Sequence, residues 1–288
     1  SDVCSSDLDM ATEESTIVAW DPAAEFAASR SATAGASEFL AYTAGDALIQ
    51  STSTLMGPEF NWFDLATGAR FAPGINGIVR GSGKVWDAGK RLMVTGALLK
   101  PGRSPDQEPR PDESFDKIFD VGVFALDAAS GKLVRQVFVE PNGPSDKNGS
   151  AEANTWIPVI LLAVSGRGDW LALTREDLRR GPPGQPTEPK TPRQVLTMDP
   201  ANPGTLRVLS DLEFQPHCGA LSPDERTLAV GCDDGSIHLL DRETGAAIAT
   251  LKAGKYGITN LLYAPDGNRL IAAHSDGSVR VWNPTDQA

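Results

Sequence analysis

Apolar and polar residues alternate over short stretches of this chain, and two stretches near its C-terminus repeat the same pattern. Ile237 and Leu239 alternate with polar neighbours, and Val279 and Val281 do so 42 residues later. A period of two is typical of strands with one buried face. The repetition extends over residues 219–283, and it therefore predicts one β-sheet unit that occurs twice.

Turn-forming residues separate the expected strands at matching positions in the two copies. Proline precedes Asp224 in the first copy and Asp266 in the second, and such pairs form turns because proline presets φ and aspartate caps its own backbone. Asp234-Gly235 and Asp276-Gly277 stand between apolar runs, which indicates hairpins, since a type I′ turn needs positive φ twice. Each unit is therefore a set of short antiparallel strands.

An apolar residue followed by Asp or Asn marks the end of the third strand, and this marker occurs six times. The intervals between markers are 43, 63, 72, 42 and 42 residues, against a repeat of roughly 40 to 45 residues for a four-stranded propeller blade. The two long intervals are single blades with insertions of roughly 20 and 30 residues. The markers are Trp20-Asp21, Phe63-Asp64, Leu126-Asp127, Met198-Asp199, Leu240-Asp241 and Trp282-Asn283.

The repeat resembles the WD40 family, specifically its degenerate bacterial members. Trp282-Asn283 stands where the Trp-Asp of that family closes the third strand, while Pro216-His217 and Gly254-Lys255 stand in place of its Gly-His. The resemblance implies a member of the YVTN/WD40-like superfamily in which the family's His-Ser-Asp-Trp network is incomplete. Together with the absence of a helical period, it predicts an all-β fold: an incomplete propeller ring of about five four-stranded blades and a partial N-terminal blade.

The two ends of the chain set the expected limits of this ring. Residues 1–8 carry no strand pattern and look like translated sequencing adaptor, so the expected domain is residues 9–288, truncated at its N-terminus. Trp20 would end the third strand of the partial blade, with residues 25–29 as its outer strand. The last blade should lack an outer strand and leave an exposed edge. In the alternative, residues 16–20 pair with residues 278–282 and close a five-membered ring.

Composition narrows the function classes. A net charge of −12 argues against a nucleic-acid surface, and no apolar run approaches the ~20 residues of a membrane helix. On the expected register, Cys232 faces His217 while Cys218 points to the other side, which argues against a disulfide. The two thiols do not identify a compartment, and a bacterial cytoplasm is favoured over a periplasm.

The candidate chemistry has simpler explanations in every case. Residues 81–84 only partly match a phosphate loop, since Ile78 and Val85 replace its required residues. The histidines lack the short spacing of zinc ligands, so we expect His217 to make a structural hydrogen bond and His238 and His274 to lie on exposed strand faces. Turn geometry explains the recurring aspartates, and packing between blades explains the tryptophans. We expect no catalytic residue, metal or cofactor.

Two functions remain open. The first is a non-catalytic scaffold that binds another protein, which the resemblance implies and which no catalytic motif opposes. The alternative is a propeller enzyme of the lactonase or quinoprotein type, with a metal or cofactor in its central channel. That enzyme needs ligands on the innermost strands of several blades, where Phe39, Ile160 and Ala220 stand instead.

The expected binding surface is a set of long polar loops. Residues 100–117 and 177–192 each connect a second strand to a third, and residues 140–154 link their two blades, so the three loops should share one face. Loops of this length either function or are solvated insertions that bind nothing. Residues 175–193 contain five basic and three acidic residues, which would suit an acidic partner. The expected partner-binding residues are Arg103, Arg110, Arg179, Arg180, Lys190 and Arg193.

Overall fold

The structure is a computed structural model of the 288-residue chain. It describes residues 3–9, 14–20, 28–35, 37–42, 47–52, 59–64, 69–71, 77–78, 83–86, 90–99, 119–139, 159–175, 193–252 and 254–284. Every element in these ranges is a β-strand, and every strand pairing is antiparallel. Within the same ranges there is no helix of the length and apolar character needed to cross a membrane.

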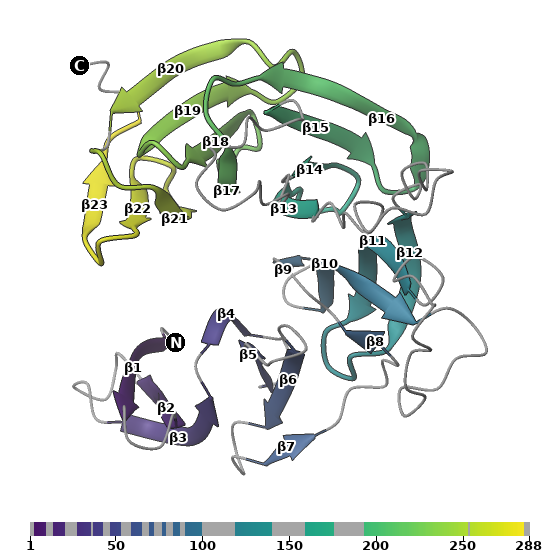
Figure 1. The fold of residues 1–288 in the computed structure, drawn as a ribbon, viewed down its shortest axis with the longest axis vertical. Helices are drawn as coiled ribbons and strands as arrows, with labels where there is room; N and C mark the ends of the chain where they lie inside the picture. The colour runs from purple at the N-terminus through teal and green to yellow at the C-terminus, as the bar shows by residue number, and fades with distance from the viewer. Residues whose placement is uncertain are drawn as a thin grey trace, which may run out of the picture. The chain divides into compact units, whose positions relative to one another are not determined.

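The chain divides into two compact units, one holding most residues up to Gln136 and the other most residues from Val137 onward. The first holds two whole sheets and most of a third (Figure 1). These sheets are β1-β2-β3 (Val3–Asp9, Glu14–Trp20, Ala28–Gly35), β4-β5-β6-β7 (Ser37–Tyr42, Ala47–Thr52, Glu59–Asp64, Arg70–Phe71) and β12-β11-β10-β8 (Leu133–Val139, Phe119–Asp127, Arg91–Leu99, Gly77–Ile78), with β9 (Gly83–Trp86) paired to β10.

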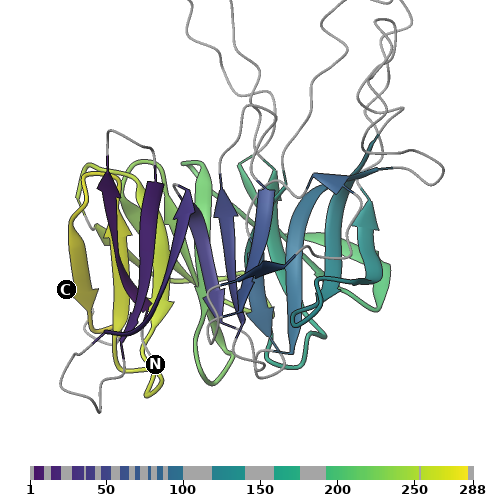
Figure 2. The same cartoon turned by 90° about the horizontal axis from the view of Figure 1, so that it is seen from below.

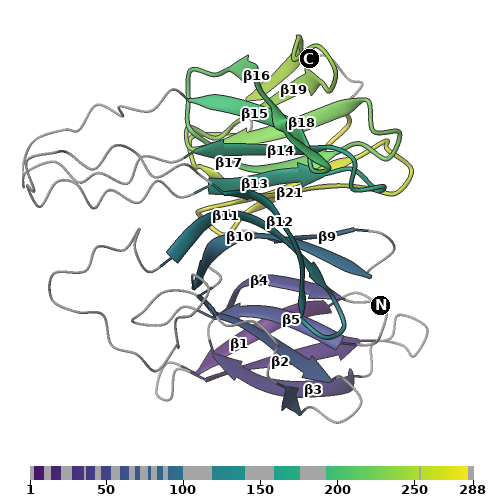
Figure 3. The ribbon, with the colours of Figure 1, turned by 90° about the vertical axis from the view of Figure 1, so that its right-hand side faces the viewer.

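The second unit contains three sheets in which consecutive strands are neighbours. Its sheets are β13-β14-β15-β16 (Val159–Val164, Leu171–Arg175, Gln194–Asp199, Asn202–Asp211), β17-β18-β19-β20 (Pro216–Leu221, Thr227–Cys232, Ser236–Asp241, Ala247–Lys252) and β21-β22-β23 (Ile258–Tyr263, Leu270–His274, Val279–Trp282). Side views show these strands running back and forth between two ends of each sheet (Figures 2 and 3).

The sheets confirm the all-β prediction and the strand-end markers. Each of the six markers coincides with the end of a strand, namely β2, β6, β11, β15, β19 and β23. Five sheets correspond to the expected blades, and the sixth is the N-terminal sheet. The expected insertion 100–117 falls between the end of β10 and the start of β11. The expected insertion 177–192 falls between the end of β14 and the start of β15. Gly83 and Lys84 open β9, so the glycine-rich stretch there is a strand entry.

The N-terminal sheet differs from expectation in two ways. Val3–Asp9, expected to have no strand pattern, forms β1 and pairs with β2. The third strand of this sheet is Ala28–Gly35 rather than residues 25–29. Strand pairing satisfies backbone N–H and C=O groups whatever the side chains, so a segment without alternation can still add to a sheet.

The C-terminal sheet confirms the missing outer strand within the described residues. It contains three strands, and β23 pairs with β22 alone. The closed-ring alternative, in which residues 16–20 pair with residues 278–282, is wrong, because β2 is already paired on both sides by β1 and β3.

The core of the second unit lies between its sheets. The sheet β17–β20 packs on both faces, and its innermost strand β17 lies between β13 and β21 (Figure 1). One face contributes Leu228, Val230 and Leu240 to a cluster with residues of β13–β16. The other contributes Ile237 and Leu239 to a cluster with β21 and β22. Because successive side chains point to opposite faces of the sheet, each strand contributes to two separate apolar layers.

The register of β17 and β18 explains the state of the cysteines. Cys218 pairs with Gly231, and an irregularity between Pro216 and Cys218 places Pro216, rather than the expected His217, opposite Cys232. Both cysteines are free and buried. Burial is the main cause, and the Asp234 carboxylate the second, that raises the pKa of the Cys232 thiol to about 12. This thiol is therefore not a nucleophile at neutral pH.

The close approach of neighbouring sheets depends on glycine at position 231. A Cβ there would lie 2.6 Å from Ile258 Cγ2 and 2.8 Å from Cys218 Sγ. We expect Gly231→Ala to lower the unfolding free energy by about 1–3 kcal/mol, because overpacking forces the sheets apart. Gly204→Ala is the control, since its Cβ would meet only the Asn202 side chain at 3.4 Å. Urea denaturation of both variants checks this, and equal midpoints would contradict it.

Candidate functional site

Antiparallel strands place successive connections at alternating ends of each sheet (Figure 3). One end, called the loop end, carries the C-terminal end of β14 and the N-terminal end of β15, the turns at 233–235 and 275–278, and the links 212–215 and 254–257. The opposite end, called the turn end, carries the tight turns at 165–170, 222–226 and 264–269 together with the β19–β20 turn.

The expected loop surface lies mostly outside the described residues. This holds for Arg103, Arg110, Arg179, Arg180 and Lys190, and also for residues 100–117, 140–154 and 177–192. Their convergence on one face stays a prediction. Arg193 is described: its guanidinium donates a hydrogen bond to the backbone carbonyl of Glu213. It is half-buried and holds the link before β17.

The link 212–215 fastens both ends of the insertion 176–192. The backbone N–H of Leu212 donates to the carbonyl of Arg193 at 2.8 Å, at the end where the insertion returns to β15. The side-chain amide of Gln215 donates to the carbonyl of Arg175 at 3.2 Å, at the end where the insertion leaves β14. Gln215 and Asp233 also exchange hydrogen bonds at 3.1 and 3.2 Å. The base of the insertion is therefore positioned by several contacts to one segment.

The aspartates of the tight turns accept hydrogen bonds from their own turns. Asp234 accepts from the Ser236 hydroxyl at 2.6 Å and Asp276 from the Ser278 hydroxyl at 2.7 Å. At the other end of the sheets, Asp224 accepts from the Ser222 hydroxyl at 2.6 Å. In the described residues no group of three or more His, Cys, Asp or Glu could hold a metal ion. Turn geometry therefore accounts for these carboxylates.

The histidines are more buried than expected. His274 is 4% exposed, and its Nδ1 lies 3.3 Å from the carbonyl oxygen of Tyr256. His238 is half-buried, with its two ring nitrogens 3.2 Å from the hydroxyls of Ser236 and Thr250. Burial lowers the pKa of His238 despite the nearby carboxylates. The expectation of an exposed face is therefore wrong for His274, which ends β22 and is covered by the link that contains Tyr256, whereas His238 is covered only in part.

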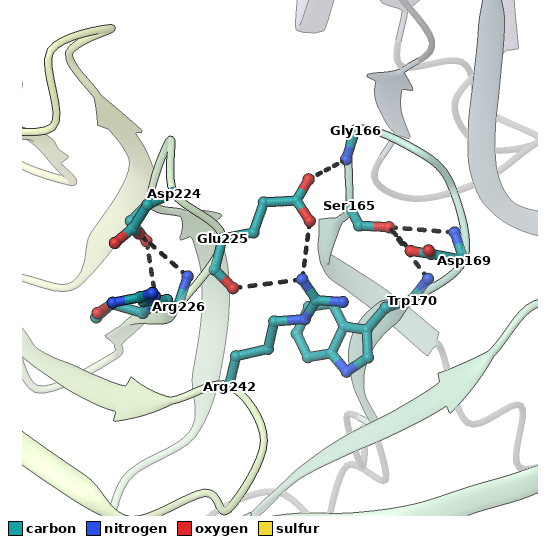
Figure 4. A network of polar contacts seen from close by, with 10 residues as sticks. Ser165, Gly166, Asp169, Trp170, Asp224, Glu225, Arg226 and Arg242 are labelled. Atoms are coloured by element: carbon teal, nitrogen blue, oxygen red, sulfur yellow. Dashed lines mark hydrogen bonds and ion pairs between the residues drawn. The ribbon is translucent and has the colours of Figure 1, made fainter.

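A network at the turn end joins two sheets and was not anticipated from the sequence (Figure 4). Glu225 has a positive φ of 57°, at the position where Gly267 stands in the next copy. Its carboxylate accepts from Gly166 N–H at 2.5 Å and from Arg242 Nη1 at 2.8 Å. The Arg242 guanidinium lies 4.9 Å from the centroid of the Trp170 ring.

This Glu225 network fixes one sheet against its neighbour. Gly166 and Trp170 belong to the turn after β13, whereas Glu225 and Arg242 belong to the next sheet. A left-handed non-glycine residue costs roughly 1–2 kcal/mol, and the charge-assisted contacts offset that cost. The sequence signal for this network is that Glu225 stands at the turn position that Gly267 occupies in the next copy.

Two residues on innermost strands, where a propeller enzyme would need ligands, instead contribute to the apolar core. Ile160 packs against the cluster between β13–β16 and β17–β20, and Ala220 packs against the cluster between β17–β20 and β21–β23. Trp170 and Trp282 pack against the same two clusters, as expected for tryptophans between sheets.

Two family models match the C-terminal part of the chain. The model "WD domain, G-beta repeat" matches residues 245–283, and "Anaphase-promoting complex subunit 4 WD40 domain" matches residues 217–261. Among curated proteins, "WD repeat-containing protein 1" of Gallus gallus is 32% identical over 78 residues, which cover 26% of this chain and 13% of that protein. The chain spans 8% to 26% of the length of the first three curated relatives that it matches.

Solved structures share the fold over nearly the whole chain. "Kuenenia stuttgartiensis Hydrazine Synthase" has a TM-score of 0.61 and 14% identity, covering 97% of this chain and 80% of that chain. "Structure of Dos1 propeller" has a TM-score of 0.58 and 12% identity, covering 94% of this chain and 62% of that chain. At these identities the likeness concerns the fold alone.

The Glu225 network should contribute measurably to stability. We expect Arg242→Met to lower the unfolding free energy by about 1 kcal/mol, because it removes a partly buried ion pair and a cation–π contact. Arg269→Met is the control, an exposed arginine in the β21–β22 turn of the next sheet. Denaturation at low and high salt checks this. The two variants should differ most at low salt, and identical losses would contradict it.

The turn aspartates predict the response to acid. Hydrogen bonds from Ser130, Ser222, Thr244 and Ser278 lower the pKa of the aspartates that they contact. A lowered folded-state pKa contributes stability that is present above the unfolded value of about 3.9 and is lost as pH falls through the folded value. The urea concentration at the unfolding midpoint should therefore decrease as the pH is lowered below about 4. A rise in stability on acidification would contradict this.

Proposed function

Because the chain is a WD40-like β-propeller, we propose that it is a non-catalytic scaffold whose loop end binds another protein. The observation that carries the proposal is that the link 212–215 holds Arg175 and Arg193, the described residues on either side of the insertion. A long polar loop held by a rigid sheet is a common arrangement for binding, since the scaffold sets its position while the loop sequence sets its specificity.

The charge of this insertion suggests the chemistry of the partner. Residues 175–193 contain five basic and three acidic residues, in a chain with a net charge of −12. Such a local excess of positive charge favours an acidic surface and disfavours a basic one. Arg179, Arg180 and Lys190 are the residues proposed to meet that surface, with Arg103 and Arg110 contributed by the insertion 100–117. Arg193 is proposed to orient the insertion.

An enzymatic propeller is the alternative function. The same fold occurs in a protein whose name is that of an enzyme, hydrazine synthase, so the fold by itself is compatible with either function. The enzymatic alternative would require a metal or cofactor bound in the channel by several sheets. Stoichiometric calcium or zinc retained through gel filtration would favour this alternative over the scaffold.

The scaffold is tested by shortening the loops. We expect replacement of residues 177–192 and 100–117 by Asp-Gly turns to leave the melting temperature unchanged, because the strands that flank them pair independently of the insertions. Capture of protein partners in a pull-down should be lost. Capture that survives both replacements would place the binding surface elsewhere.

A charge reversal separates binding from loop length. Arg179→Glu combined with Arg180→Glu should weaken partner capture, and the loss should shrink as salt is raised. Lys132→Glu combined with Arg135→Glu is the matched control, with the same charge change on exposed residues at β12. Equal weakening by both pairs would indicate an effect of net charge alone.

A further inference from the structure

The C-terminal sheet exposes apolar residues that are buried at the equivalent positions of the preceding sheet. Val279 and Val281 of β23 are 64% and 60% exposed, and Leu262 of β21 is 63% exposed. In the preceding sheet, Ile237 and Leu239 stand 42 residues before the two valines and are 0% and 1% exposed. Side chains at equivalent positions are therefore buried in one sheet and exposed in the next.

Cross-strand pairing arranges these residues in a row. Leu262 pairs with Ile271, and Ile271 pairs with Val281, so the three side chains lie on the same face of the sheet. The opposite face packs against β17–β20 through Leu261, Tyr263 and Leu270. The row Leu262–Ile271–Val281 thus ends at β23, the edge of the sheet.

The backbone of β23 also has a defined edge. The carbonyl of Ser278 accepts a hydrogen bond from His274 N–H at 2.9 Å, so residue 278 faces β22. Because hydrogen-bonding direction alternates along a strand, Val279 and Val281 direct their N–H and C=O groups away from β22. In the preceding sheet, Ile237 and Leu239 stand 42 residues before Val279 and Val281 and pair with Leu251 and Ala249 of β20. A fourth strand therefore pairs there, where β23 has none among the described strands.

We propose that this edge pairs with the same edge of a second copy of the chain. The two β23 strands run antiparallel about a two-fold axis at Val281, and two three-stranded sheets become one six-stranded sheet. An isologous contact of this kind requires a self-complementary edge. A centre at Val281 meets this requirement, because Val281 then exchanges both outward backbone hydrogen bonds with Val281 of the second copy.

The side chains fit the same register. Residues that lie opposite each other across an antiparallel pair share a face, so the row Leu262–Ile271–Val281 continues into its equivalent and forms six apolar positions in line. On the other face, Arg280 lies opposite Trp282 of the second copy. A centre at Arg280 would instead set two guanidinium groups opposite each other, and like charges so placed destabilise a sheet.

Charge does not oppose self-association at this sheet. Residues 258–283 contain two acidic and two basic residues, Asp266, Asp276, Arg269 and Arg280, and have no net charge. The whole chain carries −12, which makes copies repel one another. The proposed contact therefore joins two copies of the chain at a sheet without net charge. This sheet has an open strand edge, and such edges pair readily unless they are protected.

The oligomeric state tests the proposal. Sedimentation velocity of the full chain should show a concentration-dependent dimer, and Val281→Lys should shift it to monomer because two ammonium groups would meet at the axis. Val134→Lys, at a residue 51% exposed on β12, should dimerise like the unmodified chain. The melting temperature of monomeric Val281→Lys should be unchanged at low concentration. A chain that is monomeric at every concentration, or a Val281→Lys dimer of unchanged strength, overturns the proposal.

Disulfide trapping tests the register. In a Cys4→Ser background, Val281→Cys should form a covalent dimer on mild oxidation, because Cα atoms of such a pair lie about 5.5 Å apart, within disulfide range. Val279→Cys should not, since its equivalent lies roughly 14 Å away, four residues along the strand. Trapping of both, or of neither, overturns the Val281-centred pairing. The inference is independent of the proposed scaffold function, and a chain without the two insertions should still dimerise.

Discussion

The packing of one sheet on the next is the interaction on which the described second unit depends. Each strand alternates its side chains between two faces, and the sheet β17–β20 fills one apolar layer with Leu228 and Leu240 and another with Ile237 and Leu239. The layers close because small residues let the sheets approach, as at Gly231, where a Cβ would collide with Ile258. A four-stranded sheet with both faces buried gains stability from its neighbours rather than from its own hydrogen bonds.

Polar groups in this unit mainly shape turns and fasten links. Serine and threonine hydroxyls and backbone N–H groups hold the carboxylates of Asp224, Asp234, Asp241 and Asp276. At the end of β23, Trp282 Nε1 is a buried donor without a hydrogen-bond partner in the described part of the chain. The Glu225 network provides a different cross-link between sheets, with a charged side chain in a left-handed position.

The same architecture underlies the two proposed surfaces, which differ in kind. Connections at the loop end can lengthen without disturbing the strands, because the flanking residues are held by neighbouring links, as Arg175 and Arg193 are. The edge at β23 arises for the opposite reason, since a sheet in this repeat needs both a further strand and a further sheet to cover it. Val279 and Val281 are exposed, whereas the equivalent Ile237 and Leu239 pack against residues of β21 and β22.

The sequence by itself determined the strands, because alternation and turn chemistry are local properties. The six strand-end markers, the Asp-Gly turns and the 42-residue repeat are features of the sequence, and each corresponds to a strand boundary or hairpin. The positions of the long insertions followed from the same spacing. The basic residues proposed for binding were chosen from composition alone, and only Arg193 among them has a described contact.

Tertiary structure decided what depends on contacts between distant segments. The irregularity that moves Pro216 opposite Cys232, the burial of His274 and the pairing of β1 with β2 have no local signal, because each is set by a neighbouring strand or link. The same holds for Glu225, whose left-handed backbone is stabilised by Gly166, 59 residues away. Periodicity specifies which face of a strand is apolar, but only packing specifies what covers that face.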